Sequence, residues 1–518
     1  MIRPMNALAL LGLVAVAAHP VFAQSRPSSP VSQALLTISE ADFRAKLDAL
    51  AHDSTRGRET PSPELERATD WVAGRFRDAG LTPAGDAGGF FQTFLLRHTQ
   101  LDTLTTVTLA GPGYSATWAL GREIVYAVGG LPVELRGAPV VLLAGIPTDT
   151  EQPFGATSVR GAVLLHVISP EQLSGGALNP LHRAAQAGGA LAHIVVTEVP
   201  AEPWAAFVSE SFPEWWEMVD GPDRSANQRL AVYGAQLAAA ADLLRAAGAD
   251  PAQLVAADRQ DARLLSEFTV SVDPHYATLE ESTVANVVGV LEGSDPTLRD
   301  EAVIFTGHMD HVGLVGGRCR PSVDAPADST CNGADDNASG TVGVIELAEA
   351  YATLESRPAR TLVFAAVTAE ERGLFGSRFY VDHPVIPLER TVAVINLDMI
   401  ARNPQDTVGF VGKDYTSLGA LVDRLVGEHP ELRLVPTEHS GRYGASDHLP
   451  FAQRGVPALF FFSGEHEDLH TPLDNPERAD AEQASRIVRL AFLTGLEVAN
   501  APGRPTWDPE ARAEVVER

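Results

Sequence analysis

Apolar residues recur at helical spacing in the first part of the chain. Residues 40–50 and 63–79 carry them at every third or fourth position, and Gly80 follows the second run. That period is typical of one buried face of an α-helix, and a glycine just past the last apolar position is a common helix end. Residues 90–109 instead alternate and are rich in Thr, Leu and Val, which predicts strands.

Further along the chain the pattern changes to short apolar runs separated by turn residues. The runs at 140–144, 162–167 and 193–196 predict strands, and the Ala- and Leu-rich residues 228–247 predict a helix. Because this pattern differs from that of the chain after residue 264, we expect residues 126–262 to form a separate, smaller β-rich domain.

After residue 264 continuous apolar runs alternate with helical segments. Such runs are typical of strands that are buried on both faces. They lie at residues 286–291, 302–305, 361–367, 392–397 and 457–462. An amphipathic helix is predicted over residues 339–354. The expected fold class is therefore α/β, with a mixed, mainly parallel central sheet flanked by helices.

Length and charge narrow the class of protein. The 518 residues suffice for more than one domain and a large core. The net charge of −28 argues against nucleic acid or an anionic membrane as a partner. An acidic, well-solvated surface explains this charge, which carries no information about the charge of a substrate.

The first residues have the pattern of an export signal. Arg3 precedes the nearly continuous apolar run 7–18, and small residues stand at a cleavage position in 21–23. We expect residues 1–23 to be a signal peptide, with the mature protein in the periplasm or outside the cell. The alternative, an uncleaved anchor, is disfavoured because the run is shorter than the roughly 20 residues that span a bilayer.

Only two cysteines occur, Cys319 and Cys331, twelve positions apart. An even number of cysteines at close spacing in an exported protein favours a disulfide. The alternative, thiolate metal ligands, is weaker because histidines and carboxylates are present in sufficient number. The bridge would fasten the loop 309–334, and the effect of this loop on access to a pocket is left open.

Five short stretches each carry a zinc-type ligand, most of them where a strand would end. They are Gly307–Asp310, Gly333–Asn337, Ala369–Glu371, Asn396–Met399 and Leu469–Pro472. Ligands of α/β sheets gather at the carboxyl ends of strands. Together the stretches supply two imidazoles and at least four carboxylates. That is enough for two divalent metals that share one carboxylate, with another carboxylate left to move protons.

These motifs resemble those of the secreted co-catalytic zinc peptidases that include bacterial leucyl aminopeptidases and glutamate carboxypeptidases. The similarity extends from Gly57 to Asn475, and the block 126–262 resembles the protease-associated domain of many members. The expected organisation is a signal peptide (1–23), a first part of the peptidase domain (24–125), the inserted domain (126–262), the catalytic domain (263–500) and a charged tail (501–518).

The resemblance also implies two zinc ions per chain and a role for each matched residue. The ligands would be His308, Asp335, Glu371, Asp398 and His470. Asp335 would bridge both metals, although the residues alone do not choose between it and the adjacent Asp336. Asp310 would hydrogen-bond the ring of His308, and Glu370 would act as the general base.

A further tripeptide, Ser446-Asp447-His448, has the residue types of a hydrolase triad. Consecutive residues cannot form that geometry, because a triad is assembled from distant segments. By resemblance the tripeptide lies beside the substrate, so a possible substrate pocket comprises Arg442, Tyr443, Ser446, Asp447 and His448. His311, His383 and His466 have no matched role.

The expected function is that of a zinc-dependent exopeptidase that acts on peptides or proteins, and an aminopeptidase in particular. The alternatives are a carboxypeptidase of the glutamate carboxypeptidase type, a glutaminyl cyclase, and a non-catalytic secreted metal-binding protein. We expect no nucleic acid and no membrane anchor. The side-chain preference, the role of the inserted domain and the oligomeric state are left open.

Overall fold

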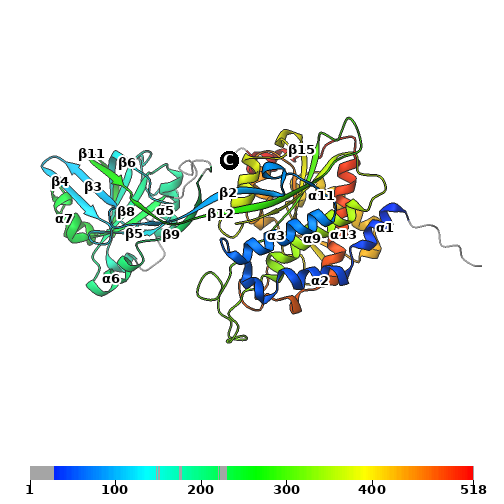
Figure 1. The fold of residues 1–518 in the computed structure, drawn as a ribbon. Coiled ribbons are helices and arrows are strands. Elements are labelled where there is room, and N and C mark those ends of the chain that lie inside the picture. Colours follow the sequence, from blue (N-terminus) through cyan, green and yellow to red (C-terminus); the bar gives the residue numbers. More distant parts are fainter. Residues whose placement is uncertain are drawn as a thin grey trace, which may run out of the picture.

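The computed structural model describes residues 29–147, 149, 152–173, 178–219, 221 and 230–516, and the predicted signal peptide lies outside them. Figure 1 shows a larger unit with helices on its sheet and a smaller unit beside it, joined by the long strands β2 and β12. Within the described ranges, no helix has both the length and the apolarity that crossing a membrane requires.

The larger unit is built on a ten-stranded mixed sheet of order β17-β16-β18-β15-β13-β14-β12-β2-β9, with β1 paired to β12. Its central strands β18, β15, β13 and β14 run parallel to one another, while β12, β2 and β9 are antiparallel. The bounds are β1 Thr82–Pro83, β2 Phe91–Leu101, β9 Glu214–Met218, β12 Tyr276–Leu291, β13 Ala302–His308, β14 Thr361–Val367, β15 Thr391–Leu397, β16 Thr407–Val411, β17 Val435–Glu438 and β18 Ala458–Phe461. The predicted mixed α/β sheet is confirmed.

Helices cover both faces of this sheet. Alternate residues of β13 show why its apolar run is continuous, since Val303 and Phe305 belong to the core on one face and Ile304 to the core on the other. The first face is covered by α1 Pro30–Thr37, α2 Glu40–Leu50, α3 Pro63–Asp78, α9 Gly340–Ala352, α11 Leu418–Glu428 and α13 Ala481–Asn500. The second face is covered by α10 Phe375–Asp382 and α12 His448–Gln453.

The two helices predicted near the start are confirmed, and each has a local reason to begin where it does. Ser39 and Ser62 cap α2 and α3, each by accepting a main-chain N–H of the first turn. Pro63 occupies the first helical position of α3, where its missing N–H leaves no bond unmade.

The smaller unit has its own eight-stranded sheet, of order β4-β3-β11-β6-β7-β8-β10-β5. Its strands are β3 Thr106–Gly111, β4 Tyr114–Ala119, β5 Ile124–Val128, β6 Leu135–Gly145, β7 Val163–Val167, β8 Ala192–Thr197, β10 Ala231–Gln236 and β11 Arg259–Asp273. Its helices are α4 Pro170–Leu173, α5 Leu178–Ala187, α6 Ala201–Ser209, α7 Leu237–Ala246 and α8 Pro251–Val255. A separate hydrophobic core fills one side of this sheet.

Two sequence-based boundaries differ from the structure of this unit. The sheet begins at β3 and ends with β11, so it extends beyond 126–262 on both sides. The helix expected over 228–247 is wrong in its first part, because β10 is a strand that pairs with β8 and β5 and the helix begins only at Leu237. Strand pairing there overrides the helical preference of an alanine-rich sequence.

The parallel strands bring the ligand-bearing segments to one edge of the larger sheet. β13 ends at His308, β14 is followed by Glu370 and Glu371, and β15 is followed by Asp398. The loop after β13 contains the predicted disulfide, which joins Cys319 to Cys331 with 5.8 Å between their α-carbons. The charged tail forms the short helix α14, Pro509–Val515.

Candidate metal centre

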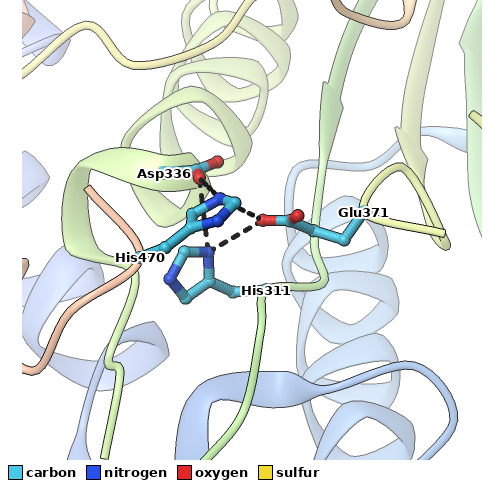
Figure 2. A group of neighbouring side chains, drawn as sticks. All are labelled: His311, Asp336, Glu371 and His470. Atoms are coloured by element: carbon cyan, nitrogen blue, oxygen red, sulfur yellow. Dashed lines mark hydrogen bonds and ion pairs between the residues drawn. The ribbon is translucent and has the colours of Figure 1, made fainter. Parts of the chain in front are cut away.

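One group of four side chains converges from four separate segments (Figure 2). His470 Nε2 lies 3.0 Å from Asp336 Oδ2 and 3.1 Å from Glu371 Oε1. His311 Nδ1 lies 3.4 Å and 3.2 Å from the same two oxygens. One donor atom from each residue falls within 4.8 Å of all the others. Two imidazoles and two carboxylates at this spacing can hold a divalent metal.

A second group lies beside the first and shares a residue with it. His308 Nε2 is 3.5 Å from Asp398 Oδ2 and 3.9 Å from Glu370 Oε2. It is also 3.3 Å from Asp336 Oδ1. The two oxygens of Asp336 thus face different groups, which is the placement of a carboxylate that bridges two metals.

The loop that carries Asp336 is fixed by a buried carboxylate. Asp474 accepts the main-chain N–H groups of Asp335 at 2.9 Å and of Asp336 at 3.1 Å. Gly333, at φ 58°, gives this loop its entry, and a β-carbon there would lie 2.4 Å from the ring of His311. A glycine is therefore required both for the left-handed conformation and for the close approach of the imidazole.

Asp335, the expected bridging ligand, lies away from both groups. Its Oδ1 accepts the main-chain N–H of Ala401 at 2.7 Å, and its Oδ2 is 3.3 Å from His466 Nε2. Consecutive side chains of this irregular segment point in different directions, so only one of the two adjacent acids can reach the centre. The structure puts Asp336 there, one position later than the sequence interpretation.

The neighbours of His308 orient its ring. Its Nδ1 donates to the main-chain oxygen of Asp310 at 3.1 Å, while the Asp310 carboxylate is 3.7 Å away. That hydrogen bond leaves Nε2 free for a metal. The Asp310 carboxylate instead accepts from Thr60 Oγ1 at 2.9 Å and from the N–H of Glu370 at 3.2 Å. Asp310 thus connects the segments of His308 and Glu370. Its main-chain oxygen binds His308, and its carboxylate binds the N–H of Glu370.

The Ser446-Asp447-His448 segment lies behind the centre. Ser446 donates to Asp398 Oδ2 at 2.7 Å, and so orients that carboxylate. Asp447 accepts from Ser377, and His448 is buried between the rings of Tyr443 and Phe460. These contacts hold the segment in place behind the metal centre.

A cavity of about 350 Å³ opens over both groups. Of the five residues expected to form a substrate pocket, Arg442 alone lines this cavity. Its apolar wall is made by Leu374, Met399, Phe460, Phe462 and Leu469. The remaining charged side chains at the cavity, beyond the two groups, are Arg318, Arg442 and Glu465.

The adjacent Glu370 and Glu371 differ in electrostatic environment. Burial raises the pKa of Glu370 well above its usual value, and the nearby Glu371 and Asp447 carboxylates add to this against the opposing effect of His308. Burial also disfavours the charged form of Glu371, but the adjacent imidazoles of His311 and His470 outweigh it and lower its pKa to about 2. Carboxyls with divergent pKa values suit a proton carrier beside a permanent anion.

Several buried polar atoms of the two groups have no hydrogen-bond partner within the described structure. They are Asp398 Oδ1, Glu371 Oε1 and both ring nitrogens of His311. Buried carboxylates without partners cost free energy unless a cation compensates them. The donor set is nitrogen and oxygen, which fits zinc better than it fits calcium or magnesium.

Paired imidazole and carboxylate groups at the carboxyl edge of a mainly parallel sheet are the arrangement of a metal-dependent hydrolase. Residues 286–494 match the family model described as Peptidase family M28. The matched part of the chain carries every residue of both groups.

The chain is also similar to proteins named as zinc metalloproteases and aminopeptidases. A probable zinc metalloprotease of Leptosphaeria maculans is 26% identical over 43% of this chain and 59% of its own length. Aminopeptidase YwaD of Bacillus subtilis is 31% identical over 33% of this chain and 39% of its own length. The chain thus spans 59% of the length of the first relative and 39% of the length of the second. An aminopeptidase structure from Aneurinibacillus sp. strain AM-1 aligns with 92% of this chain and 98% of its own, at 18% identity and a TM-score of 0.49.

His311 and Asp474 are the site residues for which sequence reasoning found no role. The available signal for His311 was its position three residues after His308, in the loop that leaves β13. Asp474 gave no signal, because its role is to accept main-chain N–H groups from a segment 138 residues away.

Proposed function

We propose that this protein is a zinc-dependent aminopeptidase with two zinc ions per chain. The observation that carries the proposal is the placement of Asp336, with one oxygen 3.3 Å from His308 Nε2 and the other 3.0 Å from His470 Nε2. A carboxylate held in this way serves two adjacent cations. The names of the Leptosphaeria and Bacillus relatives, a zinc metalloprotease and an aminopeptidase, support both the metal and the reaction.

The ligands divide between two positions. Asp336 bridges them, His308 and Asp398 complete the first, and Glu371 and His470 complete the second. Asp335 is replaced as the bridging ligand because its carboxylate bonds Ala401 and faces His466.

Zinc at these positions would polarise the scissile carbonyl and lower the pKa of a water molecule towards neutrality. Glu370 borders the cavity and is not one of the proposed ligands. Its raised pKa lets it accept the proton of the attacking water and return it to the leaving amine. Asp310 keeps the Glu370 segment in place through the N–H of Glu370.

The cavity also favours a substrate with an apolar first residue. Phe460 and Phe462 project into it from either side of Phe461, which instead packs in the core on the other face of the sheet. Leu374, Met399 and Leu469 add to the apolar wall. A leucyl-type side chain fits these surroundings.

Export and the identity of the smaller unit belong to the same proposal. The disulfide between Cys319 and Cys331 supports an oxidising compartment, in agreement with the leader pattern of residues 1–23. The smaller unit is a protease-associated domain inserted between β2 and β12 of the peptidase unit. Its position within the chain supports this assignment.

The test combines metal analysis with activity. Purified protein should contain about two zinc ions per chain, and a chelator should abolish hydrolysis of leucine-p-nitroanilide until zinc is restored. Full hydrolysis with one tightly held zinc would contradict the two-metal site. One tightly held zinc in protein that cyclises an N-terminal glutamine and does not hydrolyse this substrate would favour a glutaminyl cyclase. Absence of any peptide hydrolysis in fully loaded protein would favour a metal-binding protein without catalysis.

A further inference from the structure

We infer that His311 is a fourth protein ligand of the zinc position formed by Asp336, Glu371 and His470. The inference rests on the proposed two-zinc site and deepens it. It makes the two positions unequal, one closed by four protein donors and the other left open for chemistry.

The ring of His311 is placed as a ligand and not as a hydrogen-bond donor. Its side chain is fully buried, and within the described structure neither ring nitrogen makes a hydrogen bond. Its Nδ1 is nevertheless 3.2 Å from Glu371 Oε1 and 3.4 Å from Asp336 Oδ2. A buried nitrogen that contacts two carboxylates and bonds neither is expected where all three converge on a cation.

The two imidazoles of this position lie edge to face and not stacked. The ring of His311 stands at 76° to that of His470, with 5.3 Å between the ring centres. Figure 2 shows both rings beside the carboxylates of Asp336 and Glu371, with a dashed line from each ring to each carboxylate. Two nitrogens and two oxygens from four segments make a complete shell for zinc.

The backbone around His311 is held independently of any metal. The N–H of His311 donates to the main-chain oxygen of Arg58 at 3.2 Å. The buried Arg58 guanidinium donates to the carbonyls of Met309 at 2.8 Å and Gly333 at 2.9 Å. This bracing presents the imidazole already in place, so its binding costs little ordering.

The consequence is an asymmetry between the positions. The first position has three protein donors, which are His308, Asp398 and one oxygen of Asp336. Catalytic zinc sites keep three protein ligands and an open position, whereas closed sites have four. The His311 position should therefore hold the tighter zinc, and the open position should belong to His308 and Asp398.

The first experiment measures zinc affinity by competition with a chromophoric chelator, in the whole protein and in His311→Phe. Loss of a ligand should weaken one of two zinc ions by more than about a hundredfold, beyond the 10- to 100-fold of a residue that only orients another ligand. The other zinc should keep its affinity. His466→Gln, a buried histidine that faces Asp335 and lies outside both groups, is the matched control and should change neither affinity by more than about tenfold.

The second experiment is the crystal structure of the unaltered, zinc-loaded protein with anomalous data, so it does not depend on the variant folding. A distance of about 2.0–2.1 Å between zinc and His311 Nδ1 would establish the ligand. Two zinc ions with Nδ1 well outside that distance, or unchanged affinities in a folded His311→Phe protein, would overturn the inference while leaving the proposed function intact. Protein that binds no zinc would instead overturn the proposed function.

Discussion

At the scale of single residues, the chemistry depends on adjacent acids that serve different purposes. Glu370 and Glu371 follow the same strand, yet burial raises the pKa of one while histidines lower that of the other. Asp335 and Asp336 are likewise adjacent, and one faces Ala401 and His466 while the other reaches both groups. In both pairs, the role of each acid is decided by where its side chain points.

The first prediction concerns the proton carrier. Glu370→Gln keeps the shape of the side chain and removes its capacity to accept a proton, so turnover should fall by about a hundredfold or more. Zinc content should stay at the unaltered level, because Glu370 is not a proposed ligand. Steady-state kinetics and metal analysis on the same preparation check this. If Glu371→Gln kept its zinc and lost turnover instead, the two roles would be reversed.

The second prediction separates the adjacent aspartates. Asp336→Asn should weaken both zinc ions, since both oxygens of the bridging carboxylate are needed. Asp335→Asn should weaken neither by more than about tenfold, because its carboxylate acts only through the loop. Chelator competition compares the two variants directly. Equal losses in both would remove the distinction between them.

At the scale of elements, the loop after β13 is fastened from several sides. Its disulfide joins Cys319 to Cys331, and Arg320 donates its main-chain N–H to the oxygen of His470 at 2.8 Å. The loop therefore links β13 directly to the segment that carries His470, and its order should influence the metal centre.

The third prediction rests on this link. Replacing both cysteines by serine should lower the free energy of unfolding by about 2–4 kcal/mol, the usual range for a disulfide. Urea unfolding measures this, and a thiol assay on unfolded, unreduced protein should find no free thiol. Two thiols that titrate freely in exported material would contradict the bridge.

A row of histidines in the smaller unit leads to a fourth prediction. His166 on β7 and His193 on β8 stack with 5.5 Å between ring centres, and His182 on α5 stacks on His193 at 5.8 Å. Burial lowers the pKa of His166 to about 4 and that of His193 well below 6.5. As pH falls below about 6.5, the unfolded chain takes up protons that these folded residues refuse. Their contribution to stability is complete above that pH and is lost towards pH 4.

Comparison with His166→Gln isolates this effect. Between pH 8 and pH 5 the protein should lose about 2 kcal/mol of unfolding free energy through His166 alone, from about 1.5 pH units at about 1.36 kcal/mol each. The variant should lack that share of the pH dependence. Urea unfolding at both pH values is the measurement, and identical pH dependence in the two proteins would show that His166 is not buried as a neutral ring.

The sequence predicted most of the buried strands. It predicted little about where individual side chains point. Runs such as 302–305 and 392–397 became central strands because only strands buried on both faces are so uniformly apolar. The helix predicted over residues 231–236 was wrong, because these residues form a strand that pairs with β8 and their local composition does not reveal that pairing. At the centre, strand ends brought His308 and Asp398 together. Sequence spacing could not choose Asp336 over Asp335, since neighbours differ only in where they point.

At the scale of the whole molecule, the arginines that line the cavity of the larger unit are already paired with acidic side chains. Arg318 contacts Glu371, and Arg442 pairs with Glu465. Arg402, a further candidate for binding a substrate carboxylate, is 2.6 Å from Asp468 and does not line the cavity. Among the described residues lining the cavity, every arginine therefore has an acidic partner, which leaves no built clamp for a C-terminal carboxylate.

The last prediction is that the protein removes residues from a free N-terminus. The two arginines that line the cavity are already paired with acids, so neither is left to bind a C-terminal carboxylate. Leucine-p-nitroanilide should be hydrolysed, while its N-acetylated form and an N-blocked dipeptide ending in glutamate should not. Arg442→Ala serves as a control, because an aminopeptidase should keep its activity on the free-amine substrate when that exposed pair is removed. Cleavage of the blocked dipeptide, lost in Arg442→Ala, would instead identify a carboxypeptidase in which Arg442 leaves Glu465 to bind the substrate.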